Sequence, residues 1–293
     1  MRFSHLHSPV GDPTPRLAAI VDAGAIFLDE IMESAPETLQ HLVLGGDSEL
    51  ARVKSTVEVA LRSGITPTPA EDFTFAPAVL APPGIMAIGL NYVDHVEEMN
   101  MALDAPPTIF GFWNSSLSAH EGTVTWSTKQ TQMVDYEAEL GVVIGRDGKD
   151  IPASEALDYV WGYTIVNDMS ARDIQFSTPQ WIRGKSLDGF TPVGPWVMTA
   201  DELGDPQQLQ VTLTLNGVEL QNGHTSLMMR SVAEIIEHLS VGTTLKAGTL
   251  ISTGTPSGIG YARNPQVFMH DGDTVTAHVE KLGSLVTHCA ESA

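Results

Sequence analysis

Residues 134–145, with the sequence VDYEAELGVVIG, alternate between apolar and polar positions in their first half and end in glycine. Alternation with a period of two, together with β-branched residues, is typical of a half-buried strand. Successive side chains of a strand point to opposite faces, so Glu137 and Glu139 share one face. The other face is apolar and is expected to lie against the core; it carries Tyr136, Ala138, Leu140 and Val142.

A second apolar run, residues 160–168 (VWGYTIVND), also predicts a strand and delivers a third acid, Asp168, at its end. Neighbouring carboxylates repel one another unless positive charge lies between them. Three carboxylates are hard oxygen donors of the kind that Mg²⁺ and Mn²⁺ prefer. The two strands therefore indicate a divalent-metal site, although two glutamates two residues apart are by themselves more typical of a solvated strand face.

The first 64 residues or so have the pattern of a small α+β module. The turn at residues 22–24 separates two apolar runs and predicts a hairpin. Ser34 with Glu37 predicts a capping box before a short helix. Asp47 is expected to cap a second helix that ends at Gly64.

The prolines between residues 65 and 84 indicate a linker or an extended crossover. A short apolar strand then begins at Ile85 and is followed by a helical stretch with His95 and Glu98 three residues apart, which places them on one face. A carboxylate that holds an imidazole fixes its tautomer and raises its basicity, as a general base near neutral pH requires. A solvent-exposed His–Glu pair on a helix is the competing interpretation.

Further patterns complete the expected elements. Residues 104–125 contain prolines and polar turn residues and predict a loop that could act as a mobile lid beside the His–Glu helix. Asn216-Gly217 predicts a hairpin, and Ser231 with Glu234 predicts a helix cap. Residues 250–260 (LISTGTPSGIG) read as a strand that breaks into a glycine-rich turn, where the backbone and threonine hydroxyls can approach a small ligand.

Composition and charge restrict the possible functions. The 293 residues carry 15 basic and 36 acidic side chains, a net charge of −21, which argues against nucleic acid and anionic membrane surfaces as partners. An acidic substrate would need local positive charge from a metal or from placed cations such as Arg172 and Lys185. The single cysteine, Cys289, excludes an internal disulfide, and no run of 18 apolar residues occurs. We expect a cytoplasmic protein.

Six motifs in order resemble the fumarylacetoacetate hydrolase superfamily, in its acylpyruvate hydrolase and 2-hydroxyhepta-2,4-diene-1,7-dioate isomerase branch. They are IGLNYVDHVEE, VDYEAELGVVIG, GYTIVNDMSARDIQ, GKSLDGFTPVGPW, LNGVELQ and STGTPSGIG, which together cover roughly residues 84–288. The resemblance implies a mostly β fold with α+β additions, namely a mixed β-sandwich roll (residues 76–293) preceded by a small α+β N-terminal domain (residues 1–75). It also implies a homodimer.

Carried over residue by residue, the resemblance assigns roles to the candidate residues. Glu137, Glu139 and Asp168 would bind one Mg²⁺ or Mn²⁺ in each subunit. His95 and Glu98 would form a dyad that activates water, and Lys185 would stabilise developing negative charge. The remaining substrate contacts, besides Lys185, would be Arg172, Gln175 and Thr255.

One departure bears on the substrate. Many members of the family carry Phe-x-Lys after the lid, whereas this chain has Phe110-Gly111-Phe112. The loss of that lysine removes a cation near the site, so an uncharged or aromatic tail on the substrate becomes a possibility, with Phe112 beside it.

The resemblance and the carboxylate chemistry together predict a metal-dependent hydrolase that cleaves a C–C bond in a 2,4-dioxo acid, such as an acylpyruvate or fumarylpyruvate. The metal would chelate the 2-oxo acid, a small-molecule substrate. The same site would also suit decarboxylation of an oxaloacetate-like acid or isomerisation of a 2-oxo-diene-dioate. A binding module without catalysis is the remaining alternative.

Overall fold

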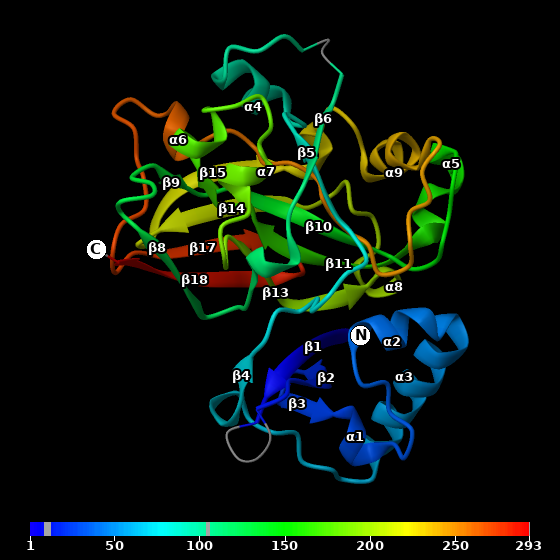
Figure 1. Ribbon diagram of the computed structural model, residues 1–293. Coiled ribbons are helices and arrows are strands. Elements are labelled where there is room, and N and C mark those ends of the chain that lie inside the picture. Colours follow the sequence, from blue (N-terminus) through cyan, green and yellow to red (C-terminus); the bar gives the residue numbers. More distant parts are fainter. Residues whose placement is uncertain (9–12, 104–105, 293) are drawn as a thin grey trace.

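A computed structural model describes residues 1–8, 13–103 and 106–292 of the chain. Figure 1 shows a larger body built around sheets and, below it, a smaller module formed by the first part of the chain. Among the described residues, none of the helices combines the length and the apolar character that a membrane span requires.

The largest sheet contains 11 strands and joins the smaller module to the larger body. Its main path runs β3–β2–β1–β13–β11–β10–β16–β5–β6, while β4 pairs with β1 and β7 pairs with β13. The sheet is mixed, because β16 is parallel to β5 and antiparallel to β10. Its strands are β1 (Arg2–His7), β2 (Arg16–Val21), β3 (Gly24–Phe27), β4 (Thr74–Phe75), β5 (Ile85–Gly89), β6 (Thr108–Gly111), β7 (Leu117–Ser118), β10 (Ala138–Ile144), β11 (Val160–Asn167), β13 (Thr191–Thr199) and β16 (Leu250–Ser252).

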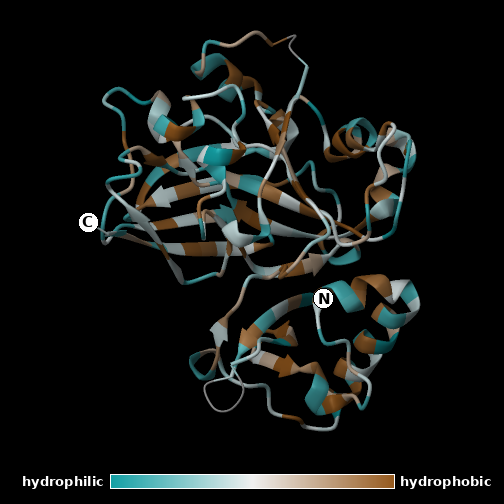
Figure 2. Ribbon diagram, in the orientation of Figure 1, coloured by the Kyte–Doolittle hydropathy of each residue, from teal (hydrophilic) through white to brown (hydrophobic). Residues whose placement is uncertain are grey.

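A second sheet of 5 strands, in the order β15–β14–β17–β18–β8, packs against β10 and β11. Its strands are β8 (Gly122–Ser127), β14 (Gln210–Leu215), β15 (Val218–His224), β17 (Thr274–Val279) and β18 (Gly283–Ser292). Leu140 and Val142 of β10 lie in the core between the two sheets, whereas Val143 points to the other side of the large sheet. Alternating hydropathy along the strands is visible in Figure 2. The predicted fold class, a mixed β-sandwich preceded by an α+β module, is confirmed.

The small module covers the other face of the large sheet. Its helices are α1 (Leu28–Ile31), α2 (Leu39–Leu44) and α3 (Gly46–Arg62). Leu42, Val53 and Val57 from these helices pack in one core with Val197 of β13 and Trp161 of β11. The predicted hairpin in this module is confirmed, since β2 and β3 pair around residues 22–23.

Three short helices lie above the N-terminal end of β10. They are α4 (Val93–Glu98), α6 (Arg172–Gln175) and α7 (Ile182–Lys185), and Figure 1 shows them together at the top of the larger body. The remaining helices are α5 (Ala153–Ala156), α8 (Ala200–Leu203) and α9 (Val232–Ser240). The capping box predicted at Ser231 and Glu234 is present at the start of α9.

The two caps predicted in the first module are wrong. The side chain of Thr38 caps α2, by accepting a hydrogen bond from the amide of His41 at 3.2 Å, so the cap lies four residues after Ser34. Helix α3 begins at Gly46 without a side-chain cap, and Asp47 is already inside its first turn. The reason is that only Gly45 separates the two helices, and its helical backbone leaves no extended residue to act as a cap.

Two element boundaries also differ from expectation. The strand predicted at residues 134–145 is divided into β9 (Val134–Asp135) and β10, because β9 pairs with β12 (Ser170–Ala171) while β10 pairs with β11. The loop predicted at residues 104–125 contains β6, β7 and the start of β8, apart from residues 104–105, which lie outside the described residues. Strand β6 forms because its backbone pairs with the exposed edge of β5.

Candidate active site and metal centre

The three acids predicted to bind a metal converge at the ends of two neighbouring strands. Ala138 is opposite Asn167 in the β10–β11 register, which brings Glu137 and Glu139 beside Asp168. The amide of Asp168 donates to the Glu137 carbonyl at 2.9 Å. One carboxylate oxygen from each of the three acids lies within 4.8 Å of the others, and all three residues are buried.

Two buried cations lie among these acids. The Lys185 ammonium is 2.9 Å from Glu137 Oε2 and 2.5 Å from Asp168 Oδ2. The Arg172 guanidinium is 2.7 Å from Glu137 Oε1 and 2.9 Å from Asp135 Oδ2. Lys185 and Arg172 come from α7 and α6, so the two helices supply the positive charge for the ends of the strands.

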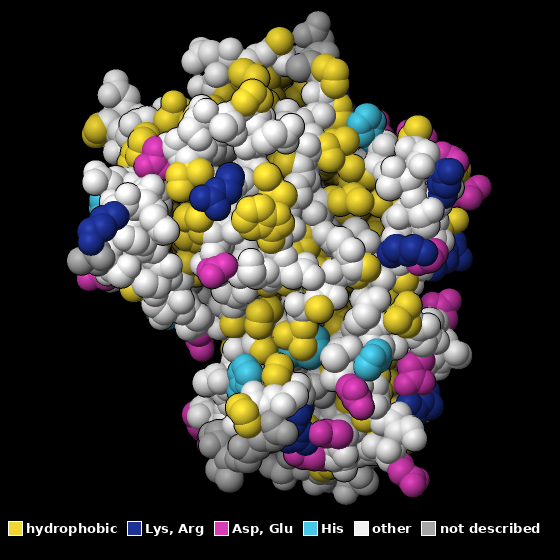
Figure 3. Space-filling view, viewed as in Figure 1, with side chains coloured by type: hydrophobic (Ala, Val, Ile, Leu, Met, Phe, Trp, Pro, Cys, Tyr) yellow, Lys and Arg dark blue, Asp and Glu magenta, His cyan; other side chains and the backbone are white. Residues whose placement is uncertain are grey.

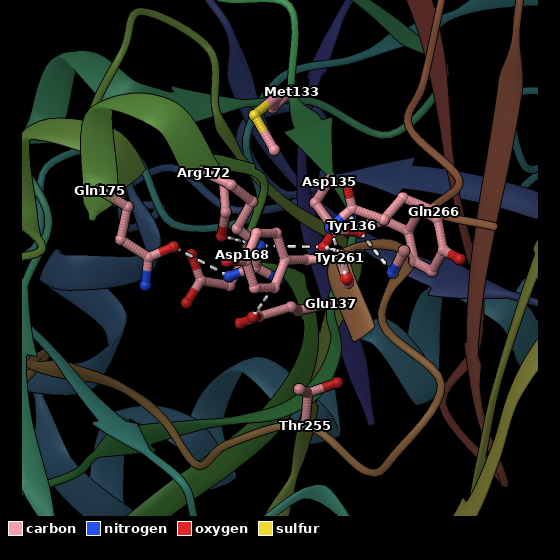
Figure 4. A network of polar contacts seen from close by, with 12 residues as sticks. Met133, Asp135, Tyr136, Glu137, Asp168, Arg172, Gln175, Thr255, Tyr261 and Gln266 are labelled. Atoms are coloured by element: carbon pink, nitrogen blue, oxygen red, sulfur yellow. Dashed lines mark hydrogen bonds and ion pairs between the residues drawn. The ribbon is translucent and has the colours of Figure 1, made fainter. Parts of the chain in front are cut away.

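Asp135 is a further acid of the site that the sequence analysis did not single out. Besides Arg172, its carboxylate accepts the amides of Gly260 and Tyr261 at 2.7 and 2.9 Å. Figure 4 shows Arg172 between Asp135 and Gln175, whose Oε1 accepts Arg172 Nη1 at 2.9 Å. We refer to six residues as the charged cluster: Asp135, Glu137, Glu139, Asp168, Arg172 and Lys185.

Burial and neighbouring charge shift the pKa values of the three predicted ligands in different directions. Burial favours the neutral form of Glu137, but Lys185 and Arg172 outweigh it and lower its pKa to about 2. Burial raises the pKa of Asp168 to about 7, with Lys185 opposing the shift. No cation of the described part of the chain contacts Glu139; burial, and then the charges of Asp168 and Glu137, raise its pKa well above the ordinary value.

The donor set fits a divalent cation. The charged cluster has four carboxylates against two cations, an excess of two acids that is costly to bury uncompensated. Asp168 Oδ1 is buried and has no hydrogen-bond partner among the described residues, although an oxygen in that position needs one. Glu139 is held by Ser252 Oγ at 2.5 Å and by the Gly254 amide at 2.8 Å through Oε2 alone. The carboxylate triad can therefore hold a metal ion.

The His95–Glu98 pair is formed on α4. His95 Nδ1 lies 2.7 Å from Glu98 Oε1, and Glu98 Oε2 accepts the Gly258 amide at 2.9 Å. An ionised carboxylate can only accept, so Nδ1 carries a proton, and in the neutral imidazole Nε2 then has the lone pair. The His95 side chain is 7 % exposed, which excludes the interpretation of a solvated surface pair.

A cavity of about 280 Å³ lies between these groups. Among its lining residues are seven of the nine predicted site residues: His95, Glu137, Glu139, Arg172, Gln175, Lys185 and Thr255. Asp168 and Glu98 do not line it, but each contacts a residue that does, Lys185 and His95.

The predicted substrate contacts differ in what they can still offer a ligand. The Thr255 hydroxyl already donates to the Ala138 carbonyl at 2.9 Å and accepts from Gln221 Nε2 at 2.8 Å. Toward the described residues Gln175 uses only its oxygen, for Arg172, so its amide nitrogen can still donate, and the residue lines the cavity. Arg172 donates three of its N–H groups to Asp135, Glu137 and Gln175, and these bonds hold it in one orientation.

Phe112, which the sequence analysis placed beside the substrate, packs elsewhere. It is 6 % exposed and belongs to the core between the small module and the large sheet. Phe110 lines the cavity instead. Residues two apart share a face only within one strand. Because β6 ends at Gly111, Phe112 turns away from the cavity.

Comparison with known proteins identifies the family. Residues 84–290 match the model of the fumarylacetoacetate (FAA) hydrolase C-terminal domain. The chain belongs to the fumarylacetoacetate hydrolase family. Within this family, it is 36 % identical over 265 residues to the mitochondrial oxaloacetate tautomerase FAHD2A of Homo sapiens, covering 90 % of this chain and 83 % of that protein.

Solved structures of the family share the whole fold. Fumarylacetoacetate hydrolase from psychrophilic Exiguobacterium antarcticum has a TM-score of 0.80 at 31 % identity, with 100 % of both chains covered. The 5-carboxymethyl-2-hydroxymuconate delta-isomerase of Mycobacterium smegmatis has a TM-score of 0.75 at 30 % identity, again with 100 % of both chains covered. Hydrolases and isomerases thus occur on one scaffold, and this chain is an enzyme of the same family.

Proposed function

We propose that the protein is a divalent-metal-dependent hydrolase that cleaves the C–C bond of a 2,4-dioxo acid of the acylpyruvate type. The observation that carries this proposal is the cavity itself, which is lined by the carboxylate site on one side and by His95 on another. A 2-oxo acid needs positive charge for its two adjacent oxygens, and water that attacks a carbonyl needs a nearby base.

Mg²⁺ or Mn²⁺ is the proposed cofactor, one per subunit, held by Glu137, Glu139 and Asp168. When bound, the ion would supply positive charge to the oxygens of a 2-oxo acid. Lys185 would add to this charge: burial opposes its protonated form, but Asp168 and Glu137 outweigh burial and raise its pKa. Lys185 therefore acts as a fixed cation and not as a base.

The residues of the chain would carry out the proton transfers. His95 Nε2 removes a proton from water, with Glu98 holding the imidazole, and the resulting hydroxide adds to the C4 carbonyl. The C3–C4 bond then breaks, its electron pair forms the enolate of pyruvate, and a proton from the imidazolium completes C3. The products are pyruvate and the carboxylic acid derived from the acyl group. Gln175 can donate an N–H to the substrate, and Arg172 and Thr255 border it.

Oxaloacetate chemistry is the second candidate. It is favoured by the 36 % identity to a protein named oxaloacetate tautomerase. Tautomerisation, decarboxylation or isomerisation of an unsaturated 2-oxo acid would use the same metal-binding residues, and His95 would move a proton on carbon without activating water.

Product analysis distinguishes these functions. The purified protein, with Mg²⁺ or Mn²⁺, is given acylpyruvates and enol-oxaloacetate while pyruvate release, CO₂ release and loss of enol absorbance are followed separately. Hydrolysis predicts one pyruvate and one carboxylic acid for each acylpyruvate consumed. Loss of enol absorbance without pyruvate or CO₂, together with inert acylpyruvates, would favour the tautomerase. The expected homodimer remains a prediction, which light scattering during size-exclusion chromatography tests.

A further inference from the structure

The rest of the cavity lining has a different character, and it meets the charged cluster at Phe110, where Lys185 Nζ lies 5.1 Å from the ring centroid. Its side chains are aliphatic, thioether or aromatic, and we refer to them as the apolar wall: Ile88, Leu90, Met99, Met101, Phe110, Phe176, Trp181 and Ile259. Several remain accessible, with Phe176 42 % and Met101 50 % exposed. On the face shown in Figure 3, hydrophobic side chains also gather around α4 and β6.

Two aromatic pairs shape this wall. Phe110 and Trp181 pack edge to face with ring centroids 5.4 Å apart, and Phe176 packs against Tyr261 at 4.9 Å. The Trp181 ring lies against β5 at Gly89, where a Cβ atom would come within 2.5 Å of the indole. The ring can occupy this position only because residue 89 has no side chain. Specific ring contacts therefore hold the side chains of the wall in place.

No free cation faces this region among the described residues that line the cavity. The two lining cations, Arg172 and Lys185, are each engaged by two carboxylates of the charged cluster. Arg183, two residues before Lys185, is exposed and does not line the cavity. The protein has a net charge of −21. A ligand with a second carboxylate at its far end would therefore be repelled there and would find no ion-pair partner.

We propose that the acyl group of the substrate ends in an uncharged apolar group, aryl or branched alkyl, which the apolar wall covers. The charged cluster would bind the 2-oxo acid end and Trp181, Phe110 and Phe176 would cover the other end. This inference rests on the proposed function for the identity of the 2-oxo acid end, and it adds the chemical class of the tail.

The test compares three acylpyruvates that differ only in the tail: benzoylpyruvate, acetopyruvate and fumarylpyruvate. We expect kcat/KM to be about 10-fold or more higher for the phenyl than for the methyl tail, because a covered ring buries more apolar surface. Fumarylpyruvate should be the poorest of the three. A preference for the diacid, or equal values for phenyl and methyl tails, would overturn the inference.

Variants locate the effect. Trp181→Ala should lower kcat/KM for benzoylpyruvate more than for acetopyruvate and so remove most of the preference for phenyl. Trp113→Ala is the matched control, because Trp113 is 45 % exposed and does not line the cavity. Should Trp181→Ala fold poorly, Phe176→Ala tests the same wall from its exposed side. Unchanged tail preference in a folded wall variant contradicts the inference.

Binding separates this inference from the proposed function. Calorimetry with the Mn²⁺-loaded protein compares 2-oxo-5-phenylpentanoate with 2-oxoadipate, neither of which has a 4-oxo group to hydrolyse. Tighter binding of the phenyl acid, without turnover of any acylpyruvate, would support the apolar-tail inference and contradict the proposed hydrolase function. Turnover of all three acylpyruvates without a tail preference would do the reverse.

Discussion

In the charged cluster, six ionisable side chains are almost completely buried and five of them are joined by ion pairs, whereas the apolar wall beside it is partly exposed and has few directional contacts. The cluster is prearranged before any ligand arrives, because each of its cations is held by two carboxylates. The wall is held by ring packing. This difference suggests that chemistry resides in the cluster and substrate choice in the wall.

The largest effect is expected from removing a ligand of the cluster. Glu139→Ala should abolish metal binding and lower kcat/KM by about 10³-fold or more for every substrate, whatever its tail, because the carboxylate triad is broken. Metal content and turnover are measured together, with Glu219→Ala on an exposed strand face as the control. A loss of kcat/KM restricted to substrates with one kind of tail would contradict the proposal that the cluster carries the chemistry and the wall the substrate choice.

The dyad lies between the two regions and should affect chemistry alone. His95→Ala is expected to lower hydrolytic kcat by about 10²-fold or more while metal affinity barely changes. Stopped assays of pyruvate and calorimetry with Mn²⁺ measure the two quantities. If metal binding were lost as well, His95 would be a ligand and its assignment as a base would be wrong. The partly exposed His224, which does not line the cavity, gives the control variant.

Asp135 tests whether the cluster depends on residues that bind no metal. Asp135→Asn keeps an oxygen for the Gly260 amide but leaves Arg172 with one carboxylate, so we expect kcat/KM to fall about 10–100-fold. Thermal unfolding should show a loss of about 3–5 kcal/mol, because a buried ion pair is broken. Asp158→Asn, at an exposed position outside the cavity, should change neither quantity appreciably. A drop in stability with unchanged kcat/KM would make Asp135 purely structural.

The smallest effects on activity are expected from substitutions of Phe110 and Phe112. Phe112→Ala should cost about 3–5 kcal/mol of stability, because a core ring is removed, and leave the tail preference intact. Phe110→Ala should weaken the tail preference several-fold and cost less stability. Chemical denaturation and kcat/KM for phenyl and methyl tails measure both. If Phe112→Ala changed selectivity more than Phe110→Ala, the placement of the apolar wall would be wrong.

The sequence is informative about the cluster because its residues lie in regular elements or directly beside them. Period-two alternation places Glu137 and Glu139 on one face, and the burial of Tyr136, Ala138 and Leu140 on the other confirms the face assignment. Asp135 continues the same alternation and could have been found from it. Its role was missed because its partners, Arg172 and the amide of Gly260, are distant in sequence.

The wall and the element boundaries were harder to predict from sequence. Strand β6 exists because β5 offers an edge, and no local alternation marks it. The helix cap falls at Thr38 and not at Ser34 because tertiary packing decides which turn begins the helix. The exchange of roles between Phe110 and Phe112 depends on where β6 ends, and single-residue boundaries are the least readable feature of a sequence.

The pairing of β1 with β13 ties the beginning of the chain to a strand almost 200 residues later. Arg2 is opposite Met198 and Phe3 is opposite Val197. During synthesis, β1, β2 and β3 must wait for β13 before the large sheet can close, so this contact is slow to form. A truncated chain without β1 would expose the backbone of β13 as a free strand edge, which invites association with other chains. The small module thus covers a strand edge of the catalytic sheet.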